Sequence, residues 1–489
     1  TIGCGAKANG VERKDGFNIT VASEIMAALC LADDLMDLKK RFGKMLVAYT
    51  YDDKPVYVHD LGIEGALAMV MKDAVLPNVV QTLEHNPVLI HGGPFANIAH
   101  GCNSVIATKA CLELADYTVT EAGFGADLGA EKFLDIKCRL AALKPNAVVI
   151  VATIRALKQH GGIALEDLKE ENVEAMLAGC ENLAKHIDTV QQFGLPYIVA
   201  INEFATDTPA EVAALEKWCE ENNHPMSLSQ VWAKGGEGAI DLANKVVALC
   251  DQENNYAPLY DLDKSIEEKV ETIAKKVYGA DGVDFTEEAQ AQIAKFNELG
   301  WDKLPICMAK TQMSLSDDGK VMGRPTGFRI TVRELRPSLG AGFIVALTGK
   351  VLTMPGLPKH PSALDMDVDE DGKKLTVPVY KMYLLAPDEG GNNGFMDDYD
   401  ENTEVEVGTY PVAGKNYYAE SITDEDGDTT TYCFDGMKIV AMVETEKGKQ
   451  PQVILIKNFR NTDVPDSLFK LPDLSLIHIS EPTRLGMIS

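Results

Sequence analysis

A glycine-rich segment is the strongest candidate for chemistry in this sequence. Residues 117–133 read YTVTEAGFGADLGAEKF, which predicts a strand, a turn rich in glycine and then a helix. Such a turn lets backbone N–H groups approach a phosphate, and the first turn of the helix adds the positive end of its dipole. We therefore expect Gly123, Phe124, Gly125 and Gly129 to contact a nucleotide or phosphate. The alternative is a tight strand–helix turn without a ligand.

The spacing of these glycines argues against a nicotinamide cofactor. It is G-x-G-x-x-x-G, one residue off the dinucleotide fingerprint. The strand that follows, ending at Thr153, also lacks the acidic residue that would bind a ribose.

Two aromatic residues follow apolar or glycine-flanked segments and form the second candidate site. The apolar strand Pro196–Ile201 is followed by Asn202 and Phe204, at the end of a strand where parallel sheets bind ligands. Trp232 precedes a glycine run that ends at Gly238, a combination that suits a flat ligand because the indole offers a stacking face. The alternative for each aromatic residue is a place in the core. Asp207 is expected to cap the helix that begins at Pro209.

A third segment contains two histidines and a cysteine within twelve residues, between His91 and Cys102. Their spacing matches no zinc pattern, and clustered carboxylates are absent from the segment. We expect a glycine-rich turn lined by histidine at an active site, and disfavour a metal site.

The elements that would position these residues alternate between short strands and helices. Apolar runs bounded by Gly, Pro or Asn recur through the first 350 residues, and the clearest helical periodicity extends from Val173 to Val190 and stops at Gly194. Alternating strands and helices predict an α/β fold with parallel sheets. The predicted strands are 45–49, 88–90, 117–119, 147–152, 197–201, 306–309 and 343–347.

Composition limits the function classes. The 489 residues have 46% hydrophobic residues and a formal net charge of −28, which fits a globular chain and excludes a general nucleic-acid binder because no basic surface is available for phosphates. The ten cysteines form no C-x-x-C pair, so we expect reduced thiols and a cytoplasmic protein. No apolar run in the sequence reaches the length of a membrane span.

The composition and the hydrophobic pattern of the sequence change near Gly372. Alternating segments separated by Asp-Gly or Lys-Gly turns predict an antiparallel β-rich segment over 373–474. The stretch Thr423–Thr429 is interpreted as an acidic hairpin turn, since a calcium loop would need a terminal bidentate Glu and a second helix. The expected strands are 403–407, 430–434, 438–443 and 452–456.

Together these motifs resemble the formate–tetrahydrofolate ligase family, also called formyltetrahydrofolate synthetases. The resemblance extends from Thr1 to Gly372. Its carriers are the segments 7–10, 15–24, 91–103, 121–139, 232–238, 304–318 and 354–359.

The resemblance implies ATP-dependent ligation of formate to the N10 atom of tetrahydrofolate through formyl phosphate. It further implies Mg²⁺, a monovalent cation (K⁺ or NH₄⁺) and a cytoplasmic homotetramer that acts on small molecules, without nucleic acid and without a membrane for residues 1–372. Phe204 and Trp232 occupy the positions where the family sandwiches the folate ring. The Gly123–Gly129 turn corresponds to the nucleotide and formyl phosphate site, and Asn202 to a nucleotide contact.

The chain also departs from the family. Two parts of the family's site would precede Thr1: the phosphate loop G-E-G-K-T-T and an arginine that helps to hold formyl phosphate. We therefore expect a P-loop NTPase-like parallel sheet without its N-terminal part, with smaller α/β domains. We also expect no ligase activity from this chain. Without that loop, a folate-binding fragment is one alternative function, and an envelope-associated β binding module in 373–474 is another. The β-rich segment loosely resembles lipoprotein-type domains, and 475–489 resembles a translated adapter read. An assembly chimera is the hypothesis we favour over a natural fusion.

Overall fold

The computed structural model describes residues 2–4, 13–15 and 19–351, and in the C-terminal part the strands 405–412, 415–423, 429–435, 438–445 and 452–455. These residues belong to two compact units, one within Thr1–Gly356 and the other within Leu357–Ile488. The domain boundary predicted near Gly372, the motif 354–359 and the tail 475–489 lie outside the described residues. In the part of the chain that is described, no helix is long and apolar enough to cross a membrane.

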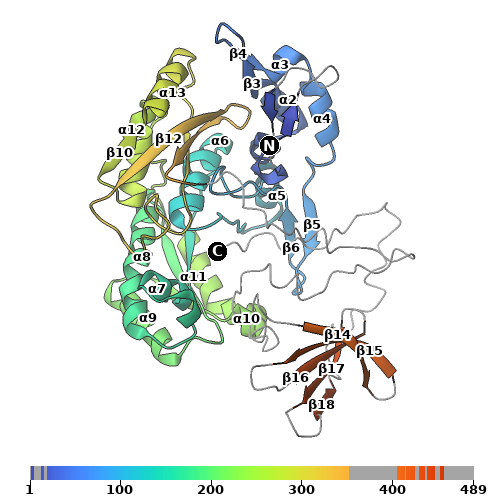
Figure 1. Ribbon diagram of the computed structural model, residues 1–489. Coiled ribbons are helices and arrows are strands. Elements are labelled where there is room, and N and C mark those ends of the chain that lie inside the picture. The colour runs from blue at the N-terminus through green and yellow to red at the C-terminus, as the bar shows by residue number, and fades with distance from the viewer. Residues whose placement is uncertain are drawn as a thin grey trace. The chain divides into compact units, whose positions relative to one another are not determined.

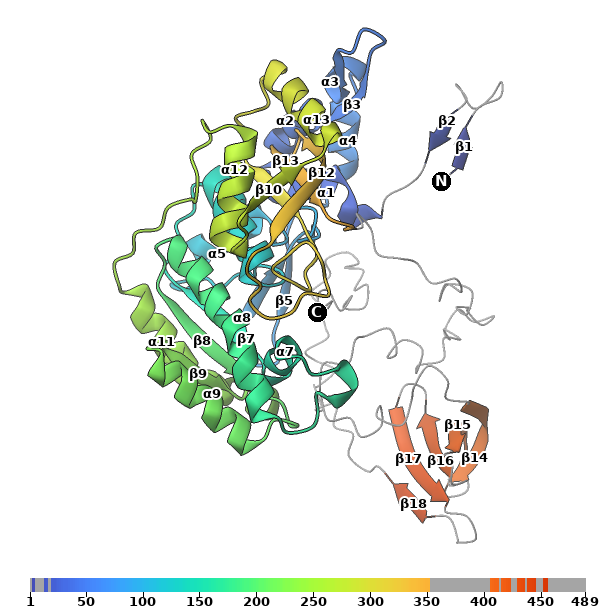
Figure 2. The ribbon, with the colours of Figure 1, turned by 60° about the vertical axis from the view of Figure 1, so that its left-hand side comes forward.

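The first unit contains a three-stranded parallel sheet, which lies in the green part of Figure 1 and is labelled in Figure 2, and this sheet confirms the α/β prediction. Its order is β7-β8-β9, and α8 and α11 both pack on it. The residues Tyr197 to Ile201 of β8 are all buried, as expected for a central strand covered on both faces. The elements of this layer are β7 (Val148–Ala152), β8 (Tyr197–Asn202), β9 (Met226–Ser229), α7 (Ile154–His160), α8 (Val173–Gln192), α9 (Pro209–Glu221), α10 (Val231–Lys234) and α11 (Ile240–Cys250).

The helix α8 illustrates why the sequence folds in this way. Asn172 caps its first turn by accepting the N–H of Ala175, and the apolar residues at helical spacing, such as Met176 and Ile187, are buried against the sheet. Gly194, with φ of 73°, turns the chain after the last residues of the helix, so the stop predicted there is confirmed.

A second, four-stranded sheet has mixed directions, in the order β10-β12-β13-β11 (Figure 2). Only β12 and β13 pair antiparallel, and α12 and α13 pack on this sheet. Its elements are β10 (Gly282–Phe285), β11 (Ile306–Ala309), β12 (Arg329–Ser338), β13 (Phe343–Thr348), α12 (Ile266–Ile273) and α13 (Glu287–Glu298).

The remaining part of the first unit consists of helices and two-stranded pairs. Two of these pairs, β3-β4 and β5-β6, are hairpins. The elements are β1 (Ile2–Cys4), β2 (Arg13–Asp15), α1 (Glu24–Leu31), α2 (Leu35–Lys44), β3 (Leu46–Tyr49), β4 (Pro55–Tyr57), α3 (Val58–Leu61), α4 (Glu64–Met71), β5 (Asn78–Gln81), β6 (Pro87–Ile90) and α5 (Val105–Leu114).

One predicted strand is wrong. Tyr117–Val119 has no regular secondary structure, and both of these apolar side chains are exposed. The alternation of apolar residues favoured a strand, but none of the described strands pairs with this segment. The glycine-rich turn is therefore entered from an irregular segment rather than from a strand.

The second unit is the antiparallel meander that the sequence predicts. Its five strands pair in chain order: β14 (Val405–Val412), β15 (Lys415–Thr423), β16 (Thr429–Asp435), β17 (Lys438–Thr445) and β18 (Gln452–Leu455). Thr423 pairs with Thr429, so the acidic segment between them joins two hairpin strands. Strand β15 is missing from the prediction.

Candidate functional site

The parallel sheet brings the two aromatic candidates to the same edge. Strands β8 and β9 are neighbours, and Asn202 is in register with Ser229. Phe204 and Trp232 follow these two strands within three residues of their ends. The carboxyl edge of a parallel sheet is where open α/β folds bind ligands, so the topology supports the predicted site. Asn202, the last residue of β8, is half-buried at the same edge.

Phe204 is fixed by the turn that follows it. Its N–H donates to the Asp207 carboxylate over 2.9 Å, and its side chain is half-buried. The prediction that Asp207 caps α9 is wrong: Thr208 is the cap and forms a reciprocal pair of hydrogen bonds with Glu211. Thr208 takes this role because it directly precedes Pro209, the first residue of the helix.

Trp232 lies on α10 with 60% of its surface exposed, whereas Trp301 has only 8%. The alternative of a core tryptophan is therefore wrong for Trp232, and its indole face is open to a ligand. Gln230, two residues before Trp232, connects the ends of β8 and β9. Its side-chain amide donates to Glu203 over 2.5 Å and accepts from Lys234 over 2.6 Å.

The glycines of the candidate phosphate turn each have a packing reason. The N–H of Gly123 donates to Gly101 O over 2.8 Å, and a Cβ on Gly129 would overlap the Gly123 carbonyl oxygen. A Cβ on Gly125 would lie 2.6 Å from Asp127 Oδ1 and 2.9 Å from His186 Cε1. Close packing of the turn on the helix thus requires these glycines whether or not a phosphate binds.

Phe124, between two of those glycines, has a φ of 65°, which is a left-handed conformation and strained for a residue with a Cβ. Its ring is 37% exposed, so it projects from the turn rather than into the core.

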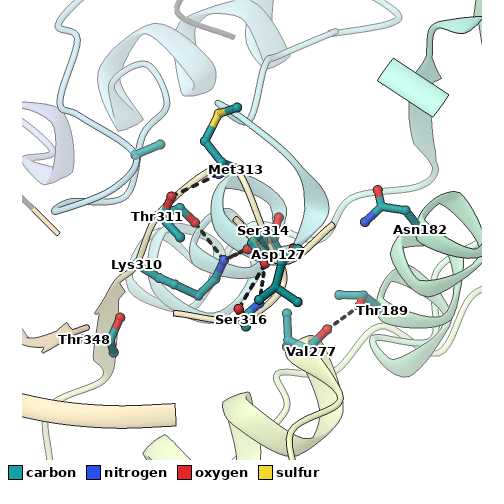
Figure 3. Close-up of polar contacts among 12 residues, drawn as sticks. Asp127, Asn182, Thr189, Val277, Lys310, Thr311, Met313, Ser314, Ser316 and Thr348 are labelled. Atoms are coloured by element: carbon teal, nitrogen blue, oxygen red, sulfur yellow. Dashed lines mark hydrogen bonds and ion pairs between the residues drawn. The ribbon is translucent and has the colours of Figure 1, made fainter. Parts of the chain in front are cut away.

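A buried ion pair anchors the helical segment that follows the turn (Figure 3). Lys310 Nζ lies 2.9 Å from Asp127 Oδ2, and both side chains are almost fully buried. The same ammonium donates to the carbonyl oxygens of Thr311 and Ser314. Burial alone would raise the pKa of Asp127, but the charge of Lys310 outweighs it and the pKa is lowered. For Lys310, burial favours the neutral amine and lowers the pKa, while the three oxygen acceptors around Nζ favour the charged form.

Two further carboxyl groups on this segment are buried. Neither oxygen of Glu131 has a hydrogen-bond partner among the described residues, and burial, reinforced by Asp135 and Asp127, raises its pKa well above the usual range. Burial also raises the pKa of Asp135 to about 7, although Leu259 N–H and Arg139 oppose this. Both pKa shifts favour the protonated, neutral form of these buried carboxyl groups.

The histidines of the third segment do not form an open site. His91 binds the Ser104 hydroxyl over 2.6 Å and the Ala74 carbonyl over 2.7 Å, so both ring nitrogens have partners within the chain. His100 is fully buried, and burial lowers its pKa to about 3. Neither ring nitrogen of His100 has a hydrogen-bond partner among the described residues, and the histidine-lined active-site turn stays a prediction.

The sequence did not reveal the buried charges on 127–137 or Lys310. The segment 126–141 is helical throughout, with π-type turns at Ala126–Ala130 and Phe133–Cys138 and an α-helical end, α6 (Arg139–Ala141). Charged residues at helical spacing normally indicate a solvated face, whereas here Lys132 and Lys137 are bound by residues between Ala96 and Thr108, and Asp127 by Lys310. The contacts within the described residues do not connect this turn with Phe204 and Trp232.

Comparison with known protein families identifies the family of this chain. The family model described as Formate–tetrahydrofolate ligase matches residues 1–376, that is, 376 of the 489 residues. This match includes both aromatic candidates and the whole glycine-rich turn.

Proposed function

The chain belongs to the formate–tetrahydrofolate ligase family, and on that premise we propose that Phe204 and Trp232 bind the tetrahydrofolate ring while the Gly123–Gly129 turn contacts nucleotide or formyl phosphate. The family joins formate to tetrahydrofolate at the expense of ATP. The observation that carries the proposal is the position of two aromatic residues at the carboxyl edge of neighbouring parallel strands, one of them with an exposed indole.

The proposed reaction has two steps. A formate oxygen attacks the γ-phosphorus of ATP, so that ADP leaves and formyl phosphate forms. The N10 amine of tetrahydrofolate then attacks the formyl carbon, inorganic phosphate leaves and the amine loses a proton. Since both steps transfer a group between bound molecules, the contribution of the protein is chiefly to position them.

The aromatic pair suits the folate ring. No ring contact joins Phe204 and Trp232 among the described residues, so neither face is covered by the other. The backbone N–H of Phe204 is bound by Asp207, and Gln230, two residues before Trp232, is bound to Glu203. A flat pterin between such rings gains stacking energy of about 1 kcal/mol per ring beyond the area that it buries.

The glycine-rich turn suits an anionic group for a different reason. The turn leads into a helical segment that begins at Ala126, and the exposed Phe124 offers an apolar face beside it. We propose that Phe124 contacts the nucleotide and that Gly123, Gly125 and Gly129 allow the backbone to approach its phosphates. Asn202 is proposed as a further nucleotide contact.

The resemblance also implies Mg²⁺ and a monovalent cation. Within the described residues no group of three or more His, Cys, Asp or Glu side chains is arranged to hold a metal ion. No step above passes through a metal ion.

We further propose that the 489-residue chain binds tetrahydrofolate without turnover, because the G-E-G-K-T-T phosphate loop does not occur in its sequence. From its membership of the family, we also propose that the chain assembles as a homotetramer. Calorimetric titration of the purified chain with tetrahydrofolate, together with an assay for 10-formyltetrahydrofolate, tests both points. Binding without formyl transfer supports the proposal. Absence of binding refutes the folate site, and formyl transfer refutes the proposed lack of turnover.

A further inference from the structure

The hairpin of β5 and β6 reaches the loop that carries Trp232 (Figure 1). The Glu84 carboxylate, at the tip of this hairpin, accepts the N–H of Gly236 over 2.5 Å. The two residues are 152 positions apart in the sequence. The hairpin therefore forms a second anchor for the Trp232 loop, in addition to Gln230.

The loop is shaped to receive this carboxylate. Gly235 has a φ of 61°, and a Cβ built on it would lie 2.8 Å from Glu84 Oε1. A Cβ on Gly236 would overlap Glu84 Oε2. The two consecutive glycines thus leave room for both carboxylate oxygens of Glu84, which any larger residue at position 235 or 236 would displace. The contact therefore depends on glycine in the loop and on glutamate in the hairpin.

The tip is closed by hydrogen bonds of its own, and its residues 82–86 are exposed. Thr82 and Asn86 are joined by the hydrogen bonds Thr82 N–H to Asn86 O at 2.9 Å and Asn86 N–H to the Thr82 hydroxyl at 3.0 Å, and His85 takes a left-handed φ of 66°. Among the described residues, the Glu84 contact is the one hydrogen bond that joins residues 82–86 to a segment outside the hairpin. A braced turn of this kind can hold a partner loop in one position.

Trp232 lies between the two anchored points. On one side, Gln230 connects the loop to Glu203, the neighbour of Phe204. On the other side, Gly236 is held by Glu84. The indole is mostly exposed, and within the segment the Gln230 N–H also donates to Gly238 O over 3.0 Å. The Glu203 and Glu84 contacts tie this segment to other parts of the chain, so they limit how far the ring can move.

We propose that Glu84 is a positioning residue that fixes Trp232 in its folate-binding orientation through the Gly236 N–H. This rests on the proposed folate site. Glu84 does not touch the substrate in this account. Because Glu84 already restricts the Trp232 loop before the folate ring binds, binding costs less conformational entropy. This preorganisation raises the affinity.

The test uses the full 489-residue chain with four variants. Glu84→Ala removes the acceptor, Glu84→Gln keeps one, and Gly236→Ala displaces the carboxylate from the other side. Leu83→Ala is the matched control, because Leu83 is the adjacent residue of the tip and 96% exposed. Loss of one exposed hydrogen bond is expected to weaken tetrahydrofolate binding about fivefold in Glu84→Ala, with Glu84→Gln and Leu83→Ala within about twofold of the parent chain.

A double-mutant cycle gives the sharper result. If Glu84 and Gly236 act through one contact, Gly236→Ala weakens binding in the parent chain but adds no further loss in the Glu84→Ala background. Equal affinity of Glu84→Ala and the parent chain, or additive losses in the double variant, overturns the proposal. Unchanged melting temperatures show that the variants are folded.

A measurement without ligand separates this proposal from the folate site. Acrylamide quenching of Trp232 is compared in chains that carry Trp218→Phe and Trp301→Phe. Glu84→Ala is expected to increase quenching, because the loop gains freedom, while Leu83→Ala leaves it unchanged. If the parent chain fails to bind tetrahydrofolate, the folate site is wrong, and the quenching result still decides whether Glu84 positions the loop. Equal quenching in Glu84→Ala and the parent chain overturns it.

Discussion

Lys310 Nζ lies 2.9 Å from Asp127 Oδ2 in a place where neither side chain has appreciable contact with solvent. This ion pair joins the residue that follows β11 to the first helical turn after Gly125. Because Asp127 also packs against the Gly125 backbone, the pair helps to fix the shape of the glycine-rich turn. A buried charge pair between two distant segments therefore supports a turn that is proposed to bind phosphate.

Replacing one member of this pair should be costly. Lys310→Met is expected to lower the free energy of unfolding of the first unit by about 3–5 kcal/mol, because Asp127 is left buried and without its counter-charge. Urea unfolding followed by circular dichroism measures the loss. The double variant Lys310→Met with Asp127→Leu should recover part of it, since no unpaired charge remains. A double variant less stable than the single one contradicts this account.

The helical glycines offer a matched comparison. Gly129→Ala is expected to destabilise the chain, because the new Cβ would overlap the Gly123 carbonyl oxygen. Gly65→Ala in α4 should be neutral or stabilising by up to about 1 kcal/mol, since the nearest atom to its Cβ is Lys39 Cε at 3.8 Å and alanine favours a helix. Thermal unfolding of the two variants checks the difference in sign. Similar shifts for both would show that the close approach at Gly129 is relieved at little cost.

The buried carboxyl of Glu131 predicts a dependence of stability on pH. Burial raises its pKa in the folded chain above the value of about 4.3 in the unfolded chain. As pH rises above that unfolded value, the unfolded chain releases its proton while the folded chain retains it, so the free energy of unfolding falls until the folded group also ionises. Glu131→Gln should flatten the fall that begins above the unfolded value. The remaining slope is assigned to Asp135, whose pKa is about 7. An unchanged pH profile in Glu131→Gln would contradict the assignment.

Trp232→Ala should weaken tetrahydrofolate binding roughly tenfold, through the loss of one stacked ring and the area that it covers. The melting temperature should change little, because most of the indole is exposed. Calorimetry measures the affinity, and Trp218→Phe is the control because Trp218 packs against His224. Equal affinities for Trp232→Ala and the parent chain would remove Trp232 from the folate site.

The sequence predicted the parallel sheet well because the relevant signals are local. The apolar run Tyr197–Ile201 reflects a strand that is buried on both faces, and the helical periodicity of α8 reflects a helix that is buried on one face. The boundaries of both elements coincide with Gly and Pro. The antiparallel meander was predicted for the same reason, from alternation and Asp-Gly turns. The strand expected at Tyr117–Val119 failed because pairing depends on a neighbouring strand that a local pattern cannot supply.

The site was predictable only in part. Phe204 and Trp232 follow recognisable strand and glycine signals, and the structure places them at one edge. The buried pair of Asp127 and Lys310 was not predictable, since charged residues in a helix ordinarily face solvent and the segments that cover them are distant in sequence. The contact of Glu84 with Gly236 was missed for the same reason.

The most direct test of the folate site is the emission of Trp232 itself. The chain has three tryptophans, so a variant with Trp218→Phe and Trp301→Phe reports on Trp232 alone. Titration with tetrahydrofolate is predicted to quench this emission with a saturating curve whose midpoint agrees with the calorimetric dissociation constant. Saturable binding by calorimetry without any change in Trp232 emission would contradict the account, because it would place the folate ring elsewhere on the chain.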